Sequence, residues 1–243
     1  MLLIITLSAF GLSAQTLKAY VLESEPLGFI DAGNPSGEHY DYLLAIAERA
    51  GVDLDVEIVP KTKLFAAIKS GEIDMAIFFR ASKWDKFVEY CSEIRKINII
   101  AMNKKGLPLN SFSDLQNSDR VGVLAKTSIS DAFDNDAGII KYSVPNYETM
   151  LKLLSAGRID SGVGNAIVLS YLINKYGYVS KLEKDVISLG TKTQWLQFSN
   201  KSAHLDLIAK FQKAVSELKA EGKLDEILTS YAGAGWSELN QSN

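Results

Sequence analysis

The chain has 243 residues, 47% of them hydrophobic and 23% charged, so it can bury one large core or two small ones and is not expected to be disordered. Its formal net charge of −3, without a visible stripe of lysine or arginine, argues against a nucleic-acid partner. Cys91 is the only cysteine, which excludes an intramolecular disulfide, and no nucleophile motif surrounds it. His39 and His204 belong to no group with metal-ligand spacing, so we expect neither a metal nor another cofactor.

The first fourteen residues are typical of a secretory signal peptide. They are apolar from Leu2 to Phe10 and then turn to small residues that end at Ala14. No later stretch reaches the roughly 18 consecutive apolar residues of a membrane-spanning helix, so we expect an exported mature protein. The usual positive charge before the apolar segment is missing, since Lys18 is the first basic residue. A buried N-terminal strand and an uncleaved anchor remain the alternatives.

Patterns of strand and helix alternate along the rest of the chain. Apolar residues at helical spacing followed by glycine indicate helices, whereas alternating or continuous apolar runs indicate strands. The first set is a strand over 17–22, a helix over 40–50, a strand over 52–59, a helix over 63–70 and a strand over 73–79. The second set is a strand over 121–124, helices over 128–133 and 147–156, a strand over 159–163 and a helix over 166–176. Such alternation predicts an α/β fold with mostly parallel sheets.

Two similar segments suggest that the fold contains two lobes. Ile68–Asp74 and Leu154–Asp160 both read as a helix end, a glycine, a charged residue, Ile-Asp and then a strand. Superposing them places Phe79 and Asn165 at corresponding strand ends. Ligands in open α/β sheets bind beyond the carboxyl ends of strands, so both ends are candidates for a cleft between the lobes. The alternative is that any two βαβ units share this order of helix end, glycine and strand.

The C-terminal part predicts a return to the first lobe. Apolar residues keep helical spacing over 205–231, with an interruption at Gly222, which indicates two helices. If they pack on the first lobe, the backbone crosses between lobes near 94–98 and again near 189–195. We therefore expect residues 15–94 and 195–243 in lobe 1 and residues 95–194 in lobe 2.

Seven landmarks follow one another over nearly the whole chain: Pro26–Phe29, Tyr40-Asp41, Ser70–Asp74, Phe112–Leu115, Val121–Val123, Gly157–Asp160 and Leu218–Leu224. In this order the sequence resembles family 3 of the bacterial extracellular solute-binding proteins, the periplasmic amino-acid-binding components of ABC importers. The resemblance implies a two-lobed, periplasmic-binding-protein-like (type II) fold with two hinge crossings. A solute docks in the cleft of such a fold, and the lobes close around it.

The resemblance also implies ligand-binding residues after the strand that ends at Phe79. In the family this loop holds hydroxyl side chains and an arginine that pairs with the ligand carboxylate. That arginine is absent here, and we expect Arg80 to replace it, with Lys83 and Lys86 as alternatives. Phe79 or Trp84 is expected to stack on the solute. Three further candidates are Glu23, Ser24 and Ser82.

Two segments of lobe 2 complete the expected site. Lys126, Thr127 and Ser128 are expected to open a helix, where they suit an anionic group or simply cap the helix. The family's ammonium-binding acid corresponds to Asn165, an amide without charge, so the solute need not be an α-amino acid.

The expected function is therefore binding. The protein is predicted to be a periplasmic monomer that captures a small polar solute, an amino acid or a related carboxylate, for import through an ABC permease of the inner membrane, and not an enzyme. A solute-sensing module of the same fold is one alternative. Another is a periplasmic cyclohexadienyl-type dehydratase, in which Glu23 or Glu25 would supply the acid or base.

Overall fold

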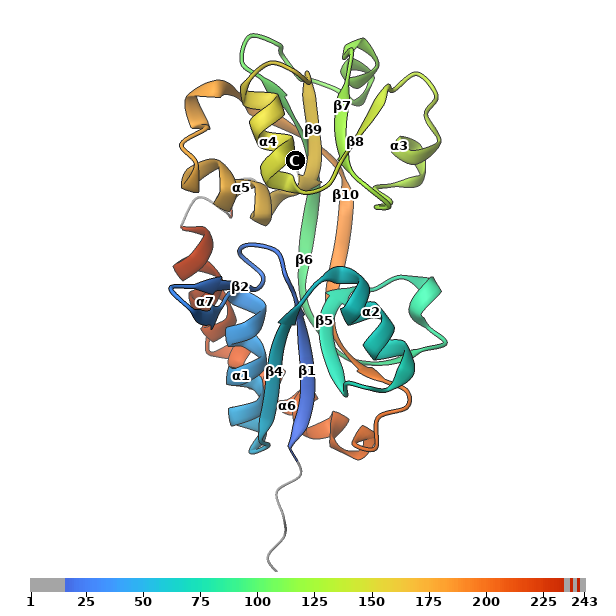
Figure 1. Cartoon of the computed structure of the whole chain (residues 1–243), viewed down its shortest axis with the longest axis vertical. Coiled ribbons are helices and arrows are strands. Elements are labelled where there is room, and N and C mark those ends of the chain that lie inside the picture. The colour runs from blue at the N-terminus through green and yellow to red at the C-terminus, as the bar shows by residue number, and fades with distance from the viewer. Residues whose placement is uncertain (1–15, 234–236, 238–239, 241–243) are drawn as a thin grey trace, which may run out of the picture.

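The computed structural model describes residues 16–233, 237 and 240, so the expected signal segment, residues 1–14, lies outside the described residues. Figure 1 shows two halves, one above the other, joined by two long strands. These strands are β6 (Val88–Lys104) and β10 (Leu182–Ser199). We call the half in the lower part of Figure 1 the lower lobe and the other half the upper lobe. The chain is a two-lobed α/β protein, as expected.

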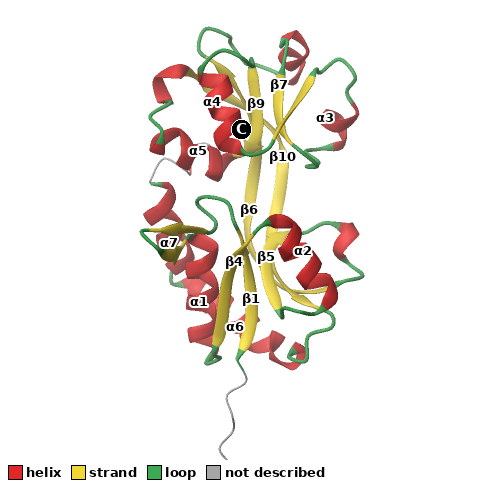
Figure 2. Ribbon diagram, in the orientation of Figure 1, coloured by secondary structure: helices red, strands yellow, loops and turns green. Residues whose placement is uncertain are grey.

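The lower lobe is built on three parallel strands: β1 (Leu17–Leu22), β4 (Leu54–Val59) and β5 (Met75–Phe79). Its helices are α1 (Glu38–Ala50), α2 (Lys61–Ser70), α6 (Ile208–Ala220) and α7 (Lys223–Ala232). A hairpin of β2 (Phe29–Asp31) and β3 (Asn34–Ser36) follows β1. Helices α1, α6 and α7 contribute to one hydrophobic cluster and α2 to another, so that both faces of the sheet are covered (Figure 2). This explains the uninterrupted apolar run in β5.

The upper lobe is also built on three parallel strands with helices. Its strands, parallel to one another, are β7 (Val121–Leu124), β8 (Lys141–Val144) and β9 (Ser161–Asn165). Its helices are α3 (Asp131–Asn135), α4 (Tyr147–Ser155) and α5 (Ala166–Lys175). Both C-terminal helices predicted from the sequence, with the break at Gly222, belong to the lower lobe as expected.

The two long strands belong to both lobes. They pair with each other in antiparallel orientation, while β10 also pairs with β5 below and β6 with β9 above. Eight strands therefore form one hydrogen-bonded sheet, in the order β4-β1-β5-β10-β6-β9-β7-β8, where we expected one sheet in each lobe. The expected crossings near 94–98 and 189–195 lie side by side in this ladder, with Asn98 opposite Thr191. The residue at which one lobe gives way to the other stays a prediction.

The two similar segments found in the sequence have the same local structure. Gly71 and Gly157 both adopt a left-handed backbone, with φ of 82° and 68°, which lets the chain leave a helix and enter a strand. The Asp74 N–H donates to the Lys18 carbonyl, and its carboxylate accepts from the Lys18 N–H at 2.8 Å. The corresponding N–H of Asp160 donates to the Arg120 carbonyl, just before β7, and its carboxylate accepts from the Asp119 N–H at 2.7 Å. The shared Gly-X-Ile-Asp pattern therefore marks a structural repeat.

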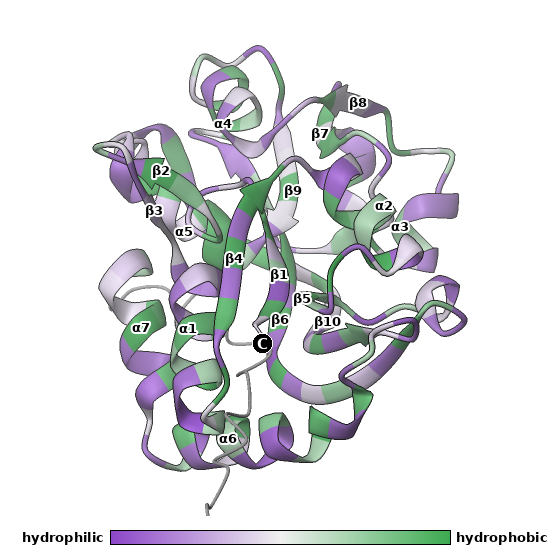
Figure 3. Ribbon diagram, turned by 60° about the horizontal axis from the view of Figure 1, so that its bottom comes forward, coloured by the Kyte–Doolittle hydropathy of each residue, from purple (hydrophilic) through white to green (hydrophobic). Residues whose placement is uncertain are grey.

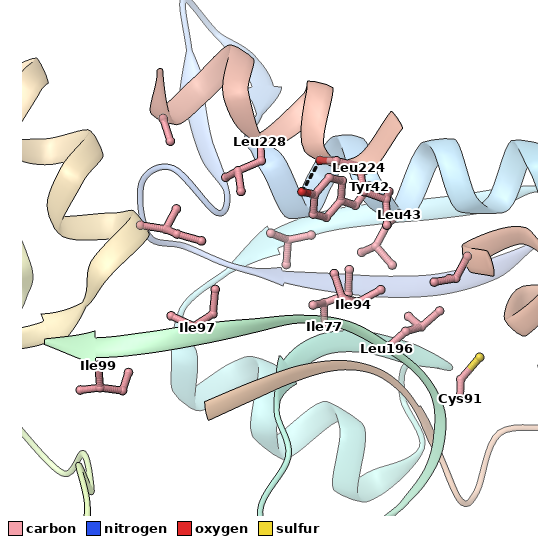
Figure 4. Packing of buried hydrophobic residues seen from close by; sticks show 14 of the residues in the cluster. Tyr42, Leu43, Ile77, Cys91, Ile94, Ile97, Ile99, Leu196, Leu224 and Leu228 are labelled. Carbon is pink, nitrogen blue, oxygen red and sulfur yellow. Dashed lines mark hydrogen bonds between the residues drawn. The ribbon is translucent and has the colours of Figure 1, made fainter. Parts of the chain in front are cut away.

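The core of the lower lobe depends on both ends of the chain. In Figure 3 hydrophobic and hydrophilic residues alternate along α1 and α6, as expected for helices with one buried face. Tyr42, Leu43 and Ile46 on α1 are fully buried. Figure 4 shows Tyr42 beside Leu224 of α7, where the tyrosine hydroxyl donates to the leucine carbonyl at 2.5 Å. Helix α7 thus closes the core that α1 begins.

Candidate functional site

The carboxyl ends of the parallel strands in both lobes point to one region between the lobes. In the lower lobe these ends are Leu22, Val59 and Phe79. In the upper lobe they are Leu124, Val144 and Asn165, because β7, β8 and β9 run in the opposite direction to β6. We call the region between these strand ends the seam. All ten predicted site residues follow or end one of these strands, so the fold brings their backbone segments to the seam.

The loop after β1 connects the lobes. Ser24 forms a tight turn, because its N–H donates to the Gly28 carbonyl and its carbonyl accepts from the Gly28 N–H. Glu23 is exposed beside it. The carboxylate of Glu25 forms an ion pair with Lys175 of α5, with 2.5 Å between Oε2 and Nζ. Leu27 is buried in the hydrophobic cluster of the upper lobe. The sequence indicated Glu23 and Ser24, but it missed the residues that span the seam.

Arg80 follows β5 but turns toward the lower lobe. Its backbone N–H donates to the Thr193 carbonyl. Its guanidinium lies 4.4 Å from the ring centre of Tyr90 and 5.1 Å from that of Trp195. Trp195 pairs with Phe78 on β5, two residues before Arg80, so the guanidinium is folded back from the strand end. The role of Arg80 as the carboxylate anchor therefore stays a prediction that requires the side chain to move.

The structure places Trp84 in the core of the lower lobe. It is 7% exposed and stacks on Phe65 at 4.5 Å between ring centres. The role of Trp84 as a ring that stacks on the solute therefore stays a prediction that requires the ring to leave this core. Phe79 is partly buried against the other hydrophobic cluster of the lobe, at the end of β5. Ser82 is exposed and opens the short 3-10 turn that follows, and both stay candidates.

The loop after β7 does not open a helix, contrary to our expectation. Helix α3 begins at Asp131, and its N-cap is Ser130, not Thr127 or Ser128. Ser128 instead donates from Oγ to the Asp134 carboxylate at 2.6 Å and accepts from Lys192 at its carbonyl oxygen. Lys126 is exposed and has a left-handed φ of 55°, a conformation that favours glycine.

Asn165 has a structural role at the end of β9. It is the N-cap of α5, and its Oδ1 accepts from the N–H groups of Ile167 at 2.9 Å and Val168 at 3.3 Å. Its own N–H donates to the Tyr147 hydroxyl. The side chain is 4% exposed. A contact between Asn165 and a solute stays a prediction, and its capping bonds leave only the amide nitrogen to make one.

Three lysines lie at the seam, of which the sequence analysis named only Lys83, as an alternative to Arg80. Lys61 is the first residue of α2, Lys83 lies in the turn after β5, and Lys192 lies on β10 between the lobes. The ammonium of Lys192 donates to the Ser128 carbonyl and so reaches the upper lobe. We call these three residues the lysine cluster. They are 131 positions apart at most (192 minus 61), and a single sequence gives no signal that joins them.

A buried polar cluster lies below the seam, where α1 starts against the long strands. It consists of Glu38, His39, Arg95 and Gln194, with the last two opposite each other in the ladder. Arg95 pairs with Glu38 at 2.9 Å, yet burial raises the pKa of the Glu38 carboxyl. Burial, together with the positive charge of Arg95, lowers the pKa of His39 to about 3. His39 is therefore neutral at physiological pH.

Other features of the described residues do not suggest a second kind of site. A pocket of about 220 Å³ lies in the lower lobe, away from the strand ends, and is lined by Tyr42, Ile94, Arg95, Lys219, Leu224 and Asp225. Across residues 16–233 and the two described C-terminal positions, no group of three or more His, Cys, Asp or Glu side chains could hold a metal ion. Within the same part of the chain, no helix is long and apolar enough to cross a membrane. Cys91 is buried in β6, and burial raises the pKa of its thiol to about 12.

The sequence of the chain matches a family model. The model for bacterial extracellular solute-binding proteins, family 3, matches residues 18–234. The chain belongs to this family. The resemblance inferred from the seven landmarks is confirmed.

Individual relatives of this family 3 protein are distant. A probable amino-acid-binding protein, YxeM, of Bacillus subtilis (strain 168) is 24% identical over 216 residues, which cover 86% of this chain and 80% of YxeM. An ancestral arginine-binding protein bound to arginine has a TM-score of 0.72 at 23% identity, over 90% of this chain and 98% of that one. A histidine kinase sensor domain with similarity to periplasmic binding proteins also has a TM-score of 0.72, at 19% identity, over 90% and 96% of the two chains. These structures support the fold.

Proposed function

We propose that this family 3 protein is exported, captures an amino acid or a related small carboxylate between its lobes, and delivers it to an ABC permease. The family supports a solute-binding role, and the relative YxeM is named as a probable amino-acid-binding protein. The observation that carries the proposal is that polar groups of both lobes meet at the seam. They do so at the carboxyl ends of the strands, where α/β sheets bind their ligands.

Contacts across the seam support a closing motion. The Glu25–Lys175 ion pair joins the loop after β1 to α5, and the Lys192–Ser128 hydrogen bond joins a long strand to the loop after β7. Leu27 of the lower lobe is buried among side chains of the upper lobe. These contacts belong to a closed arrangement, and all of them flank the strand ends. A solute at the seam would add its own contacts to both lobes and so favour this arrangement.

The dehydratase alternative has less support. Glu25, one of the two carboxylates considered for proton transfer, is paired with Lys175. Glu23 is exposed on the loop. A dehydratase would need one of them to be aimed at a bound substrate. The test is turnover of prephenate or arogenate, and product formation that disappears in Glu23→Gln would replace our proposal.

Calorimetry and small-angle scattering test the binding function. The purified protein is titrated with amino acids, small carboxylates and amines, and binding is expected to raise the melting temperature in proportion to ln(1 + [L]/Kd). The same solute should reduce the radius of gyration, because the lobes close on it. If no solute in the panel raises the melting temperature, or if binding leaves the radius unchanged, the proposal is wrong. Association of the loaded protein with membranes that carry the permease would distinguish import from sensing.

A further inference from the structure

The lysine cluster places three positive charges on one side of the seam. Lys61 and Lys83 belong to the lower lobe, and Lys192 lies opposite Ile97 on the strand pair between the lobes. Lys83 follows Arg80, whose N–H donates to the carbonyl of Thr193, the residue after Lys192, and Lys61 starts α2 two residues after the end of β4. The positive charge of Lys83 lowers the pKa of both other ammonium groups. Burial is the larger cause of both shifts. Ammonium groups that lose part of their hydration and repel one another are costly to keep charged.

The start of α2 adds to this positive field. Its N-cap is Pro60, whose side chain cannot accept a hydrogen bond, and no acidic residue lies in the first turn. The N-terminus of a ten-residue helix carries about half a positive charge, which Asp or Glu normally offsets. Here the first helical residue is Lys61, which increases the field instead. A lysine is unfavourable at the N-terminus of a helix, and residues that contradict such local preferences concentrate at functional sites.

The protein itself offsets only part of this charge. Asp134 is the carboxylate whose charge raises the pKa of Lys192. It also accepts hydrogen bonds from the Ser128 hydroxyl and from the Ile129 N–H. The three ammonium groups of the lysine cluster and the single carboxylate of Asp134 together carry a net charge of two positive units (3 − 1 = 2). Lys126, exposed on the loop that carries Ser128, provides a further positive charge from the upper lobe.

We infer that the solute of this protein is a small dianion, held between the N-terminus of α2 and the ammonium groups of Lys61, Lys83 and Lys192. The inference rests on the proposed binding function and adds its substrate class. It assigns the main anion contact to the lysine cluster, since the guanidinium of Arg80 lies on the rings of Tyr90 and Trp195. A dicarboxylate and a phosphate share the required chemistry. Cationic solutes are excluded because the lysines repel them. Neutral solutes are excluded because they would leave the lysine ammonium groups unpaired.

Matched solutes test the charge directly. The purified protein is titrated by calorimetry at low and high salt with succinate, L-glutamate and inorganic phosphate, and with succinamide, L-glutamine and L-arginine as probes of lower or opposite charge. We expect a dianion to bind at least about tenfold more tightly than its uncharged amide, and we expect added salt to weaken the binding. Comparison of succinate with phosphate identifies which of the two chemistries the protein recognises.

Three variants locate the contact. Lys61→Gln, Lys83→Gln and Lys192→Gln each remove one positive charge at nearly constant size, and each should weaken dianion binding by about tenfold or more. The matched control is Lys213→Gln on α6, whose side chain is 79% exposed, and its affinity should equal that of the unchanged protein. The melting temperature without solute shows whether each variant folds. It should not fall for the cluster variants, because removal of one of three repelling charges does not destabilise the fold.

Each outcome decides between the two proposals. Tight binding of succinate or phosphate that the cluster variants weaken supports both the inference and the binding function. Equal or tighter binding of L-glutamine or L-arginine overturns the dianion assignment and leaves the binding function in place. Dianion binding that survives all three substitutions overturns the lysine cluster as its site. Absence of binding for every solute overturns both.

Discussion

Asp74 and Asp160 occupy equivalent positions in the two lobes. Each follows an isoleucine at the entry to a strand, and each carboxylate accepts a hydrogen bond from the backbone N–H of a residue that precedes or begins a neighbouring strand, Lys18 or Asp119. The aspartates thus fix the start of the central strand in each lobe. Their equivalence shows that the two lobes share this local structure.

Replacement of either aspartate should reduce stability. In Asp160→Asn the side chain loses its charge and its ion pair with Lys104, so we expect a loss of about 1–2 kcal/mol in the free energy of unfolding, measured by urea titration. Asp74→Asn is the matched variant in the lower lobe, where the Ser202 hydroxyl also donates to the carboxylate at 2.6 Å. If both variants unfold at the same urea concentration as the parent protein, these bonds do not fix the strands.

The effect of Asp160 should depend on pH. Burial raises the pKa of its carboxyl, but the hydrogen bonds from Lys104 and the Asp119 N–H outweigh burial and hold the pKa below its usual value of 3.8. Stability from a depressed carboxyl pKa is present above the unfolded value and is lost as pH falls through the folded value. The difference between parent and Asp160→Asn should therefore be constant at neutral pH and shrink below about pH 4.

His39 should make the protein less stable in mild acid. Its pKa of about 3 in the folded state lies below the usual 6.5, because the imidazole is buried beside Arg95. Between these values the unfolded chain binds one more proton, so this contribution falls as pH is lowered from 6.5 toward 3, at up to about 1.4 kcal/mol per pH unit. The His39→Gln variant should lose this slope, whereas His204→Gln should keep it. Equal slopes for all three proteins would contradict a buried neutral imidazole.

The ion pair between Glu25 and Lys175 should favour the closed arrangement only slightly. Both side chains are partly exposed, and such pairs contribute about 0.2–1 kcal/mol. Glu25→Gln and Lys175→Gln are each expected to weaken solute binding by two- to fivefold at most, mainly through faster release. A double-mutant cycle on dissociation rates isolates the pair, and a coupling of zero would show that it does not act across the seam.

Gly164 should tolerate no side chain. A Cβ at this position would lie 2.2 Å from Cε1 of Tyr147, whose hydroxyl also accepts a hydrogen bond from the Asn165 N–H. Gly164→Ala must displace this ring, and we expect a loss of about 1–3 kcal/mol and a disturbed end of β9. Gly162→Ala is the matched control, because its Cβ meets the flexible end of Met150 at 3.1 Å. Thermal unfolding should rank the parent first, Gly162→Ala second and Gly164→Ala last.

Local patterns in the sequence predicted most of the fold. The strands over 17–22 and 121–124 have the predicted bounds, since each is a short apolar run between polar loops. The repeated Gly-X-Ile-Asp pattern predicted the structural repeat in the two lobes, because the backbone conformation at the glycine and the hydrogen bonding at the aspartate are local properties. The prediction of a helix over 128–133 was wrong about where the helix begins. The side chain of Ser130, and not that of Thr127 or Ser128, accepts the N-terminal capping hydrogen bond, so the helix begins at Asp131.

The candidate site was harder to predict because its interactions join distant segments. Arg80 and Trp84 were selected for their chemistry, but a sequence does not show whether a ring is enclosed by other rings or where a guanidinium turns. Trp84 is taken up by aromatic neighbours on α2 and β5. The lysine cluster depends on the ends of two strands and on a third element about a hundred residues later. Only the folded chain brings these charges together.

The hydrogen bond between Tyr42 and Leu224 joins residues 182 positions apart in the chain. A ribosome therefore completes almost the whole polypeptide before α1 can be covered, and until then Tyr42 and Leu43 remain in contact with solvent or with another protein. A chain cut short before α7 would leave this apolar surface open.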